Sequence, residues 1–177
     1  MERKKPTASA KRSPARPAAK ANKPRPQTIK NVLVSNSQRR IRLPLKRVQE
    51  LVTFLAQREK QTLDQVDIAI VGKQAMARLN EEHLGHAGPT DVLSFNLGEG
   101  PAGGLCAQLI VCSDVAIAQA RLRGQPAWKE LLLYITHGLL HTFGYDDHAP
   151  ADSRKMHARE DQLLEEFGIG RVYEEKR

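Results

Sequence analysis

AWKELLLYITHGLLHTF, residues 127–143, is the stretch from which the rest of the chain can be interpreted. Pro126 precedes it and Gly144 follows it, as is typical of the start and end of a helix. The stretch is strongly apolar, which predicts a helix buried in the core. His137 and His141 are four residues apart, so on a helix they lie on one face, about one turn apart. Two polar rings in such a helix need partners, because burying an unpaired polar group costs free energy.

On either side of this helix, short apolar runs alternate with amphipathic segments. GEGPAGG (98–104) is a flexible turn or flap between two runs that indicate a hairpin, and Ser113 is expected to cap the following helix. Because a hairpin argues against a purely parallel sheet, the fold class is α+β. We expect a single domain with a mixed β-sheet, a central apolar metal-bearing helix and packed helices. Strands are expected at 31–36, at 66–72, at VLSF (92–95) within 89–98, and at 105–112. Helices are expected at 43–60, 73–85, 114–122, 127–143 and 151–167.

Basic charge is concentrated at the start of the chain. The 177 residues include 28 Lys and Arg and 20 Asp and Glu, a formal net charge of +8. Residues 1–30 hold ten of the basic residues and one acidic residue, so the remainder is close to neutral. This Pro- and Ala-rich segment cannot bury enough apolar surface to offset its ordering entropy. We therefore expect a disordered basic tail at 1–30, a folded domain at 31–170 and a short charged tail at 171–177.

The tail is either a nucleic-acid-binding segment or a solvated extension with no specific role, and the sequence leaves both open. In the first case, basic residues such as Lys11, Arg12, Arg16 and Lys20 would add salt-sensitive affinity for RNA. An organelle transit peptide is a third option, which the prolines disfavour. The chain has no apolar run near the roughly 18 residues of a membrane span and no hydrophobic core of a secretory signal. A cytoplasmic protein with no membrane partner is expected.

A metal site is predicted at HGLLHTFGYDDH (137–148). Gly144 breaks the helix, so the chain can turn back and bring a third ligand to His137 and His141. Three protein ligands leave a fourth position for water, which is the pattern of a catalytic zinc. The alternative is that both are satisfied core histidines and His148 lies on the surface. Gly138 stands where H-E-x-x-H proteases have their general base, which argues against that class and not against zinc.

HGLLHTFGYDDH, taken with PTDVLSF (89–95), resembles the bacterial YbeY family over about residues 31–168. The resemblance implies a zinc-dependent, single-strand-specific endoribonuclease in 16S rRNA 3′-end maturation and ribosome quality control, with one Zn²⁺ per chain. Its partners would be single-stranded rRNA and the ribosome or small-subunit proteins. The alternative is a non-catalytic ribosome assembly factor whose zinc stabilises the fold. A zinc hydrolase acting on another substrate, such as a peptide, is disfavoured by the missing Glu.

The resemblance makes His137 and His141 the first two zinc ligands. The family's third His corresponds to position 147, where this chain has Asp147, and His148 follows one residue later. We favour His148, since an irregular turn can absorb an extra residue. Asp147 is the alternative third ligand, because zinc also accepts carboxylate oxygen. The sequence does not identify a catalytic base.

Further candidates surround the predicted ion. Asp91 and Ser94 would border the cleft, although the former could equally cap a turn, and Tyr145 and Asp146 would support a zinc ligand. His157, on the last helix, is expected to be exposed.

One departure from the family pattern concerns phosphate binding. Many members have an Arg four residues after an Asn that matches Asn80, and this chain has Leu84 there. His86 or Arg121 could substitute for it. For His83 and His86 we prefer a position in a surface loop without a role in catalysis.

Overall fold

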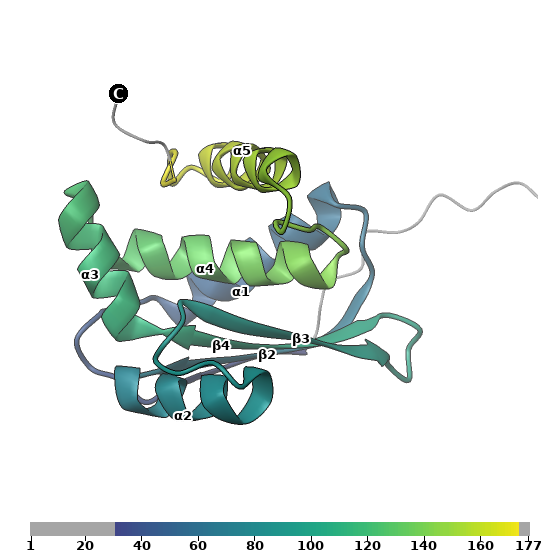
Figure 1. Ribbon diagram of the computed structural model, residues 1–177. Coiled ribbons are helices and arrows are strands. Elements are labelled where there is room, and N and C mark those ends of the chain that lie inside the picture. The colour runs from purple at the N-terminus through teal and green to yellow at the C-terminus, as the bar shows by residue number, and fades with distance from the viewer. Residues whose placement is uncertain (1–30, 174–177) are drawn as a thin grey trace, which may run out of the picture.

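Figure 1 shows the computed structural model, which describes residues 31–173. It confirms a single α+β domain with a mixed sheet, and each predicted strand and helix is present. Among the described residues, no helix combines the length and apolar character needed to cross a membrane. The elements are β1 (Asn31–Asn36), α1 (Leu45–Arg58), β2 (Leu63–Val71), α2 (Lys73–Leu84), β3 (Val92–Glu99), β4 (Leu105–Cys112), α3 (Ser113–Arg123), α4 (Ala127–Thr142) and α5 (Pro150–Glu166).

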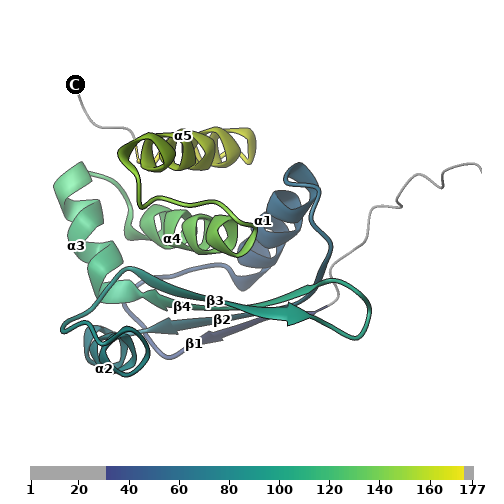
Figure 2. The same ribbon diagram turned by 45° about the vertical axis from the view of Figure 1, so that its right-hand side comes forward.

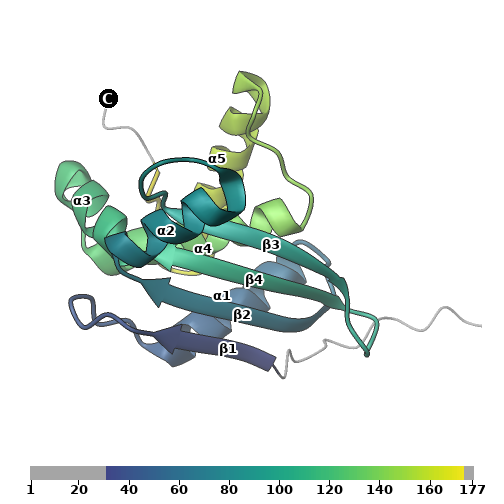
Figure 3. The same cartoon turned by 60° about the horizontal axis from the view of Figure 1, so that its bottom comes forward.

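The four strands form one sheet in the order β1-β2-β4-β3. β1, β2 and β4 run parallel, and β3 pairs antiparallel with β4 as the predicted hairpin, with Val92 opposite Val111. β3 is therefore an edge strand, and its outer side is not covered by another strand (Figure 3). This edge borders the histidine-bearing end of α4.

Helices cover both faces of the sheet in unequal numbers. α1, α3, α4 and α5 lie on one side, and α2 lies on the other (Figures 1 and 2). α4 packs on the sheet and α5 packs over α4, so α4 is enclosed between two layers. Its apolar side chains are buried as predicted, among them Leu131, Leu132, Ile135, Leu139 and Leu140. The middle position of α4 explains why its sequence is apolar on more than one face.

Gly138 lets α4 approach the sheet closely. A Cβ at this position would lie 2.9 Å from Leu109 Cδ2 and 3.1 Å from Val92 Cγ2. Strands β3 and β4 therefore approach the helix backbone most closely at Gly138. As a consequence, His137 lies beside the β3 edge.

Two local predictions need correction or extension. Ser113 does not cap α3, since its hydroxyl donates to the Val71 carbonyl across the sheet end and no side chain caps this helix. Val172 is buried and Tyr173 is half-buried, and both donate their backbone N–H to Asp161. The first residues of the predicted C-terminal tail thus pack on the domain. The predicted basic tail at 1–30 lies outside the described residues.

Candidate metal centre

The C-terminal half of α4 brings two imidazoles together. His137 and His141 lie one turn apart, with ring centroids 4.6 Å apart, and their Nε2 atoms face one another at 3.1 Å. Both rings are half-buried. The helical spacing in the sequence thus produces the pair that was predicted.

The other nitrogen of each ring is held by an acceptor. His137 Nδ1 donates to Glu160 Oε1 at 2.7 Å, and His141 Nδ1 donates to the Tyr145 carbonyl at 3.0 Å. Because carboxylate and carbonyl oxygens only accept, these contacts place the ring protons on Nδ1. Both Nε2 lone pairs then point at each other, an arrangement that requires a shared proton or a cation between them.

Negative charge surrounds the pair. Burial by itself would lower the pKa of His137, but the hydrogen bond and charge of Glu160, with the charges of Asp91 and Asp147, raise this pKa above its ordinary value. The same negative field would stabilise a bound cation.

Asp147 returns to the two histidines after the helix ends. Gly144 adopts a left-handed conformation, with φ +98°, which turns the chain back. The Asp147 carboxylate then lies 3.7 Å from His137 Nε2 and 3.6 Å from His141 Nε2. Two ligands of one tetrahedral zinc ion are about 3.3 Å apart, given bond lengths of about 2.0–2.2 Å. Separations of 3.1, 3.6 and 3.7 Å therefore fit a zinc ion with small adjustments.

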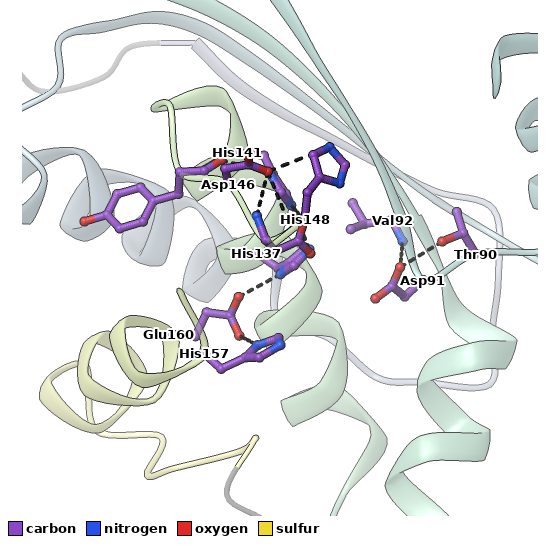
Figure 4. A network of polar contacts seen from close by, with 11 residues as sticks. Thr90, Asp91, Val92, His137, His141, Asp146, His148, His157 and Glu160 are labelled. Carbon is purple, nitrogen blue, oxygen red and sulfur yellow. Dashed lines mark hydrogen bonds and ion pairs between the residues drawn. The ribbon is translucent and has the colours of Figure 1, made fainter. Parts of the chain in front are cut away.

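His148 does not join this group. Its side chain is 91% exposed, and its Nε2 lies 3.7 Å from Asp146 Oδ1 (Figure 4). Asp146 Oδ1 also accepts the backbone N–H groups of Asp147 and His148. These hydrogen bonds, that of His148 foremost, lower the pKa of Asp146. Asp146 therefore organises the turn that carries Asp147, and the described arrangement gathers Asp147 rather than His148 with the histidine pair.

A groove of about 710 Å³ runs past the three side chains along the β3 edge. Asp91 and Ser94, both predicted to border a cleft, line it. Asp91 also fills the role of a local cap, because its Oδ1 accepts the Thr90 hydroxyl and the Val92 N–H. Asp91 therefore lies at the groove and also caps the turn before β3, and its role toward substrate or metal stays a prediction.

Among residues 31–173, no arginine lines the groove in place of the one that the family pattern has. Leu84 lines it and is 53% exposed, and none of the lining residues is Lys or Arg. Arg121 lines a separate recess with Arg40 and Trp128. The carbonyl of His86 accepts from the buried Asn80 side chain, which also binds the Gly88 carbonyl. Asn80 thus shapes the loop that leads into β3.

Tyr145 serves the site through its backbone. Its carbonyl orients His141, while its hydroxyl donates to Glu59 Oε2 at 2.8 Å and ties the turn to the end of α1. Burial, and then Glu59, raise the pKa of Tyr145. The Tyr145 backbone thus holds one ring of the histidine pair, whereas its side chain contacts a different element.

Glu160 was not among the predicted site residues, and the prediction that His157 is exposed is wrong. Glu160 is 1% exposed and accepts from His137 and from His157 Nδ1, the latter at 2.9 Å. His157 is half-buried rather than exposed, and its ring stacks on Tyr173 with centroids 3.6 Å apart. A signal existed, because Glu160 is four residues after Met156 and four before Leu164, on the apolar face of α5.

Comparison with known proteins gives a family match. The family described as Endoribonuclease YbeY matches residues 33–168. An Endoribonuclease YbeY from Nocardioides sp. (strain ATCC BAA-499 / JS614) is 35% identical over 131 residues, covering 69% of this chain and 88% of the relative. Another, from Anaeromyxobacter sp. (strain Fw109-5), is 39% identical over 106 residues, covering 59% of this chain and 55% of the relative.

A solved structure shares the fold. The solution structure of TM1509 from Thermotoga maritima superimposes with a TM-score of 0.53 and 23% sequence identity, covering 82% of this chain and 99% of that one. At this identity the likeness concerns the fold alone. The family match over most of the chain has a wider meaning: this protein belongs to the endoribonuclease YbeY family.

Proposed function

We propose that this endoribonuclease cleaves single-stranded rRNA at a zinc ion held by His137, His141 and Asp147, in 16S rRNA 3′-end maturation and ribosome quality control in the bacterial cytoplasm. The observation that carries the zinc site is the pair of Nε2 lone pairs facing each other at 3.1 Å, with the Asp147 carboxylate beside both. The membership of the chain in an endoribonuclease family supports RNA cleavage as its reaction. We also propose that the protein binds ribosomal RNA and proteins of the small ribosomal subunit.

Bound zinc would polarise a phosphoryl oxygen and lower the pKa of a bound water toward about 7. The chain's own residues have separate tasks. Glu160 keeps the proton of His137 on Nδ1, and the Tyr145 carbonyl does the same for His141, so both Nε2 atoms stay available. An open groove along an edge strand suits a single strand, whose bases and backbone are accessible.

Phosphate binding needs positive charge that the groove lacks in its lining. The metal supplies part of it, and the basic residues before β1, such as Lys11, Arg12, Arg16 and Lys20, would supply the rest without sequence specificity. Deleting residues 1–30 should then flatten the salt dependence of RNA binding. An unchanged slope would refute this role of the segment.

One observation favours a second function, that of a non-catalytic assembly factor. Leu84 lines the groove, and no Lys or Arg of the described part of the chain does, so this part offers an RNA strand few cationic contacts near the proposed metal. Such a protein would bind rRNA and ribosomal proteins, and its zinc would only stabilise the fold.

The deciding experiment is cleavage of a single-stranded rRNA fragment by zinc-loaded protein, with His141→Ala purified in parallel to control for contaminating nucleases. We expect cleavage by the wild type alone. Equal or absent cleavage in both preparations would favour the assembly factor.

The third ligand is tested by the zinc content of two neighbouring variants. We expect Asp147→Ala to lose most of its zinc and His148→Ala to keep it, because only the carboxylate lies beside the two imidazoles. The reverse result would restore His148 as the ligand and would mean that the turn rearranges when metal binds.

A further inference from the structure

A recess lined by arginines lies behind α3, away from the metal centre. Arg40 and Arg42 of the segment after β1 line it with Arg121 of α3 and Trp128 of α4, and it measures about 460 Å³. This volume is within the usual range of ligand sites. The remaining lining is apolar or uncharged, and no Asp or Glu among residues 31–173 belongs to it. This cavity, named here the arginine recess, therefore carries charge of one sign.

Two of the three guanidinium groups have no acidic partner. Arg40 Nη1 forms an ion pair with Asp114, which holds this side chain in place. Arg42 and Arg121 are exposed, and neither makes a hydrogen bond or an ion pair with another residue of the described chain. Their two positive charges are therefore available to an anion.

An aromatic ring lies among these cations. Trp128 is half-buried, and Lys129 Nζ lies 5.9 Å from the centroid of its ring, which brings a further positive charge close to the recess. Proteins that bind single-stranded nucleic acid combine cations, which contact the phosphates, with aromatic rings, on which bases stack. A guanidinium also presents a planar fork that matches two phosphate oxygens. The arginine recess thus offers contacts for both parts of a nucleotide.

The helix α3 separates the arginine recess from the metal centre. One side of α3, including Gln119, lines a cavity to which His137 belongs, and the other side, including Ile117, lines the arginine recess. Trp128 and His141 lie near opposite ends of α4, about 20 Å apart along its axis at ~1.5 Å per residue. A nucleotide in the arginine recess is therefore distant, along the strand, from the one at the metal.

We infer that the arginine recess binds a single-stranded segment of the RNA several nucleotides from the cut, with phosphates at Arg42 and Arg121 and a base at Trp128. The inference rests on the proposed function for the identity of the strand. An acidic protein segment would be attracted by the same charge, but it would bring no planar base to the indole ring. The recess anchors a long RNA, whereas the groove along β3 receives the part that is cleaved.

Trp128 provides a direct test, because it is the only tryptophan in the chain and its fluorescence reports this recess. The zinc-loaded full-length protein is titrated with a 2′-O-methylated single strand of about 20 nucleotides, long enough at ~3.4 Å per nucleotide to extend from the metal to the recess. We expect the strand to quench the emission, because a base stacked on an indole ring quenches its fluorescence. Poly-glutamate is the comparison and should leave the emission unchanged. A strand that binds without quenching, or quenching by poly-glutamate that equals or exceeds that by the strand, would overturn the inference.

The salt dependence of binding tests the two free arginines. The double variant Arg42→Gln/Arg121→Gln should flatten the slope of log K against log salt by about 1.4, since each phosphate contact to a single strand contributes about 0.7. Arg78→Gln/Arg154→Gln is the matched control, because it removes the same charge from exposed positions that line neither the groove nor the arginine recess. The control should keep the wild-type slope. Equal slopes in the two double variants would contradict the inference.

Substrate length separates this inference from the proposed function. Zinc-loaded wild type and Arg42→Gln/Arg121→Gln are compared on strands of about 20 and about four nucleotides, the latter too short at ~3.4 Å per nucleotide to reach the recess from the metal. We expect the double variant to have an unchanged kcat and a KM for the long strand about tenfold higher near 0.15 M salt, the counterion-release contribution of two phosphate contacts. Its cleavage of the short strand should match that of the wild type.

The two hypotheses then fail in different ways. Cleavage of the long strand with the same KM in wild type and in the double variant would overturn the inference and leave the nuclease intact. If the protein cleaves neither strand but the long strand still quenches Trp128, the arginine recess remains an RNA-binding site and the proposed nuclease fails.

Discussion

Two buried glutamates lie near opposite ends of α4, and the side chains that donate hydrogen bonds to them belong to different residue types. Glu130, in the first turn of α4, is 0% exposed, and both its oxygens accept from Arg123 Nη1 at 2.9 Å. Gln125 donates to the same carboxylate. Glu160, on α5, is 1% exposed and accepts from the two imidazoles of His137 and His157.

The chemistry of the partners separates the two roles. A guanidinium is always charged and only donates, so the pair of Arg123 with Glu130 is complete in itself. An imidazole that donates from Nδ1 still has a lone pair on Nε2. The hydrogen bond to Glu160 therefore makes the ring of His137 more basic, which would strengthen the bond between Nε2 and a metal ion. A buried carboxylate is structural in the first region, and in the second it would tune a ligand of the proposed metal site.

The largest effect is expected from breaking the first pair. Arg123→Met leaves the charge of Glu130 buried without its cation, which should lower the free energy of unfolding by about 3–5 kcal/mol. Urea denaturation of the zinc-free protein measures this loss. The double variant Arg123→Met/Glu130→Leu should recover most of it, since an apolar pair can replace a buried ion pair. Zinc bound per folded molecule should not change, and a loss of zinc would show that the two regions are coupled.

Glu160→Gln should weaken zinc binding by about 10–100-fold, because the neutral amide makes His137 a poorer ligand. Competition with a chromophoric chelator gives the affinity. Glu165→Gln, on the same helix but exposed, is the matched control and should bind zinc as wild type does. The ¹⁵N shifts of the His137 ring report directly whether its proton stays on Nδ1. Unchanged affinity would mean that the hydrogen bond between Glu160 and His137 only packs α5 against α4.

A smaller effect is expected from the second imidazole. His157→Phe keeps a ring on Tyr173 but removes the 2.9 Å hydrogen bond to Glu160, which should cost about 1 kcal/mol of stability. Thermal unfolding of the metal-free protein checks this value. Zinc affinity should stay close to that of wild type, since His137 keeps its own contact with Glu160. A large fall in affinity would instead make His157 part of the metal centre.

Local sequence patterns predicted most of the fold. The apolar runs gave β1, β2 and β4, and the pairing of β3 with β4 followed from a short glycine-rich turn between two apolar runs. The prediction for Ser113 was wrong because a hydroxyl at a strand end can reach a carbonyl of the next strand, a contact 42 residues away in sequence. Capping rules consider only neighbours along the chain.

Within the site, too, local patterns were predictable and contacts between distant residues were not. The spacing of His137 and His141 needed only the geometry of one helix. The preference for His148 was based on counting residues along the turn. The sequence of the turn did not show that Asp146 would accept two backbone N–H groups. These hydrogen bonds hold the turn so that Asp147 faces the histidines. His157 was misjudged because its partner Tyr173 comes from beyond the end of α5.

The sequence by itself determined a helix with two histidines on one face, a break after it, and a β-hairpin in an α+β domain, because helical and strand periodicities are local properties of the chain. Only the tertiary structure decided what surrounds the histidines. Glu160 is 23 residues from His137 and reaches it because α5 packs over α4. This packing buries the Glu160 carboxylate, which the sequence shows only as one acidic residue on an apolar helix face. Which acidic groups lose contact with water, and so act on a metal ligand, depends on packing between distant elements.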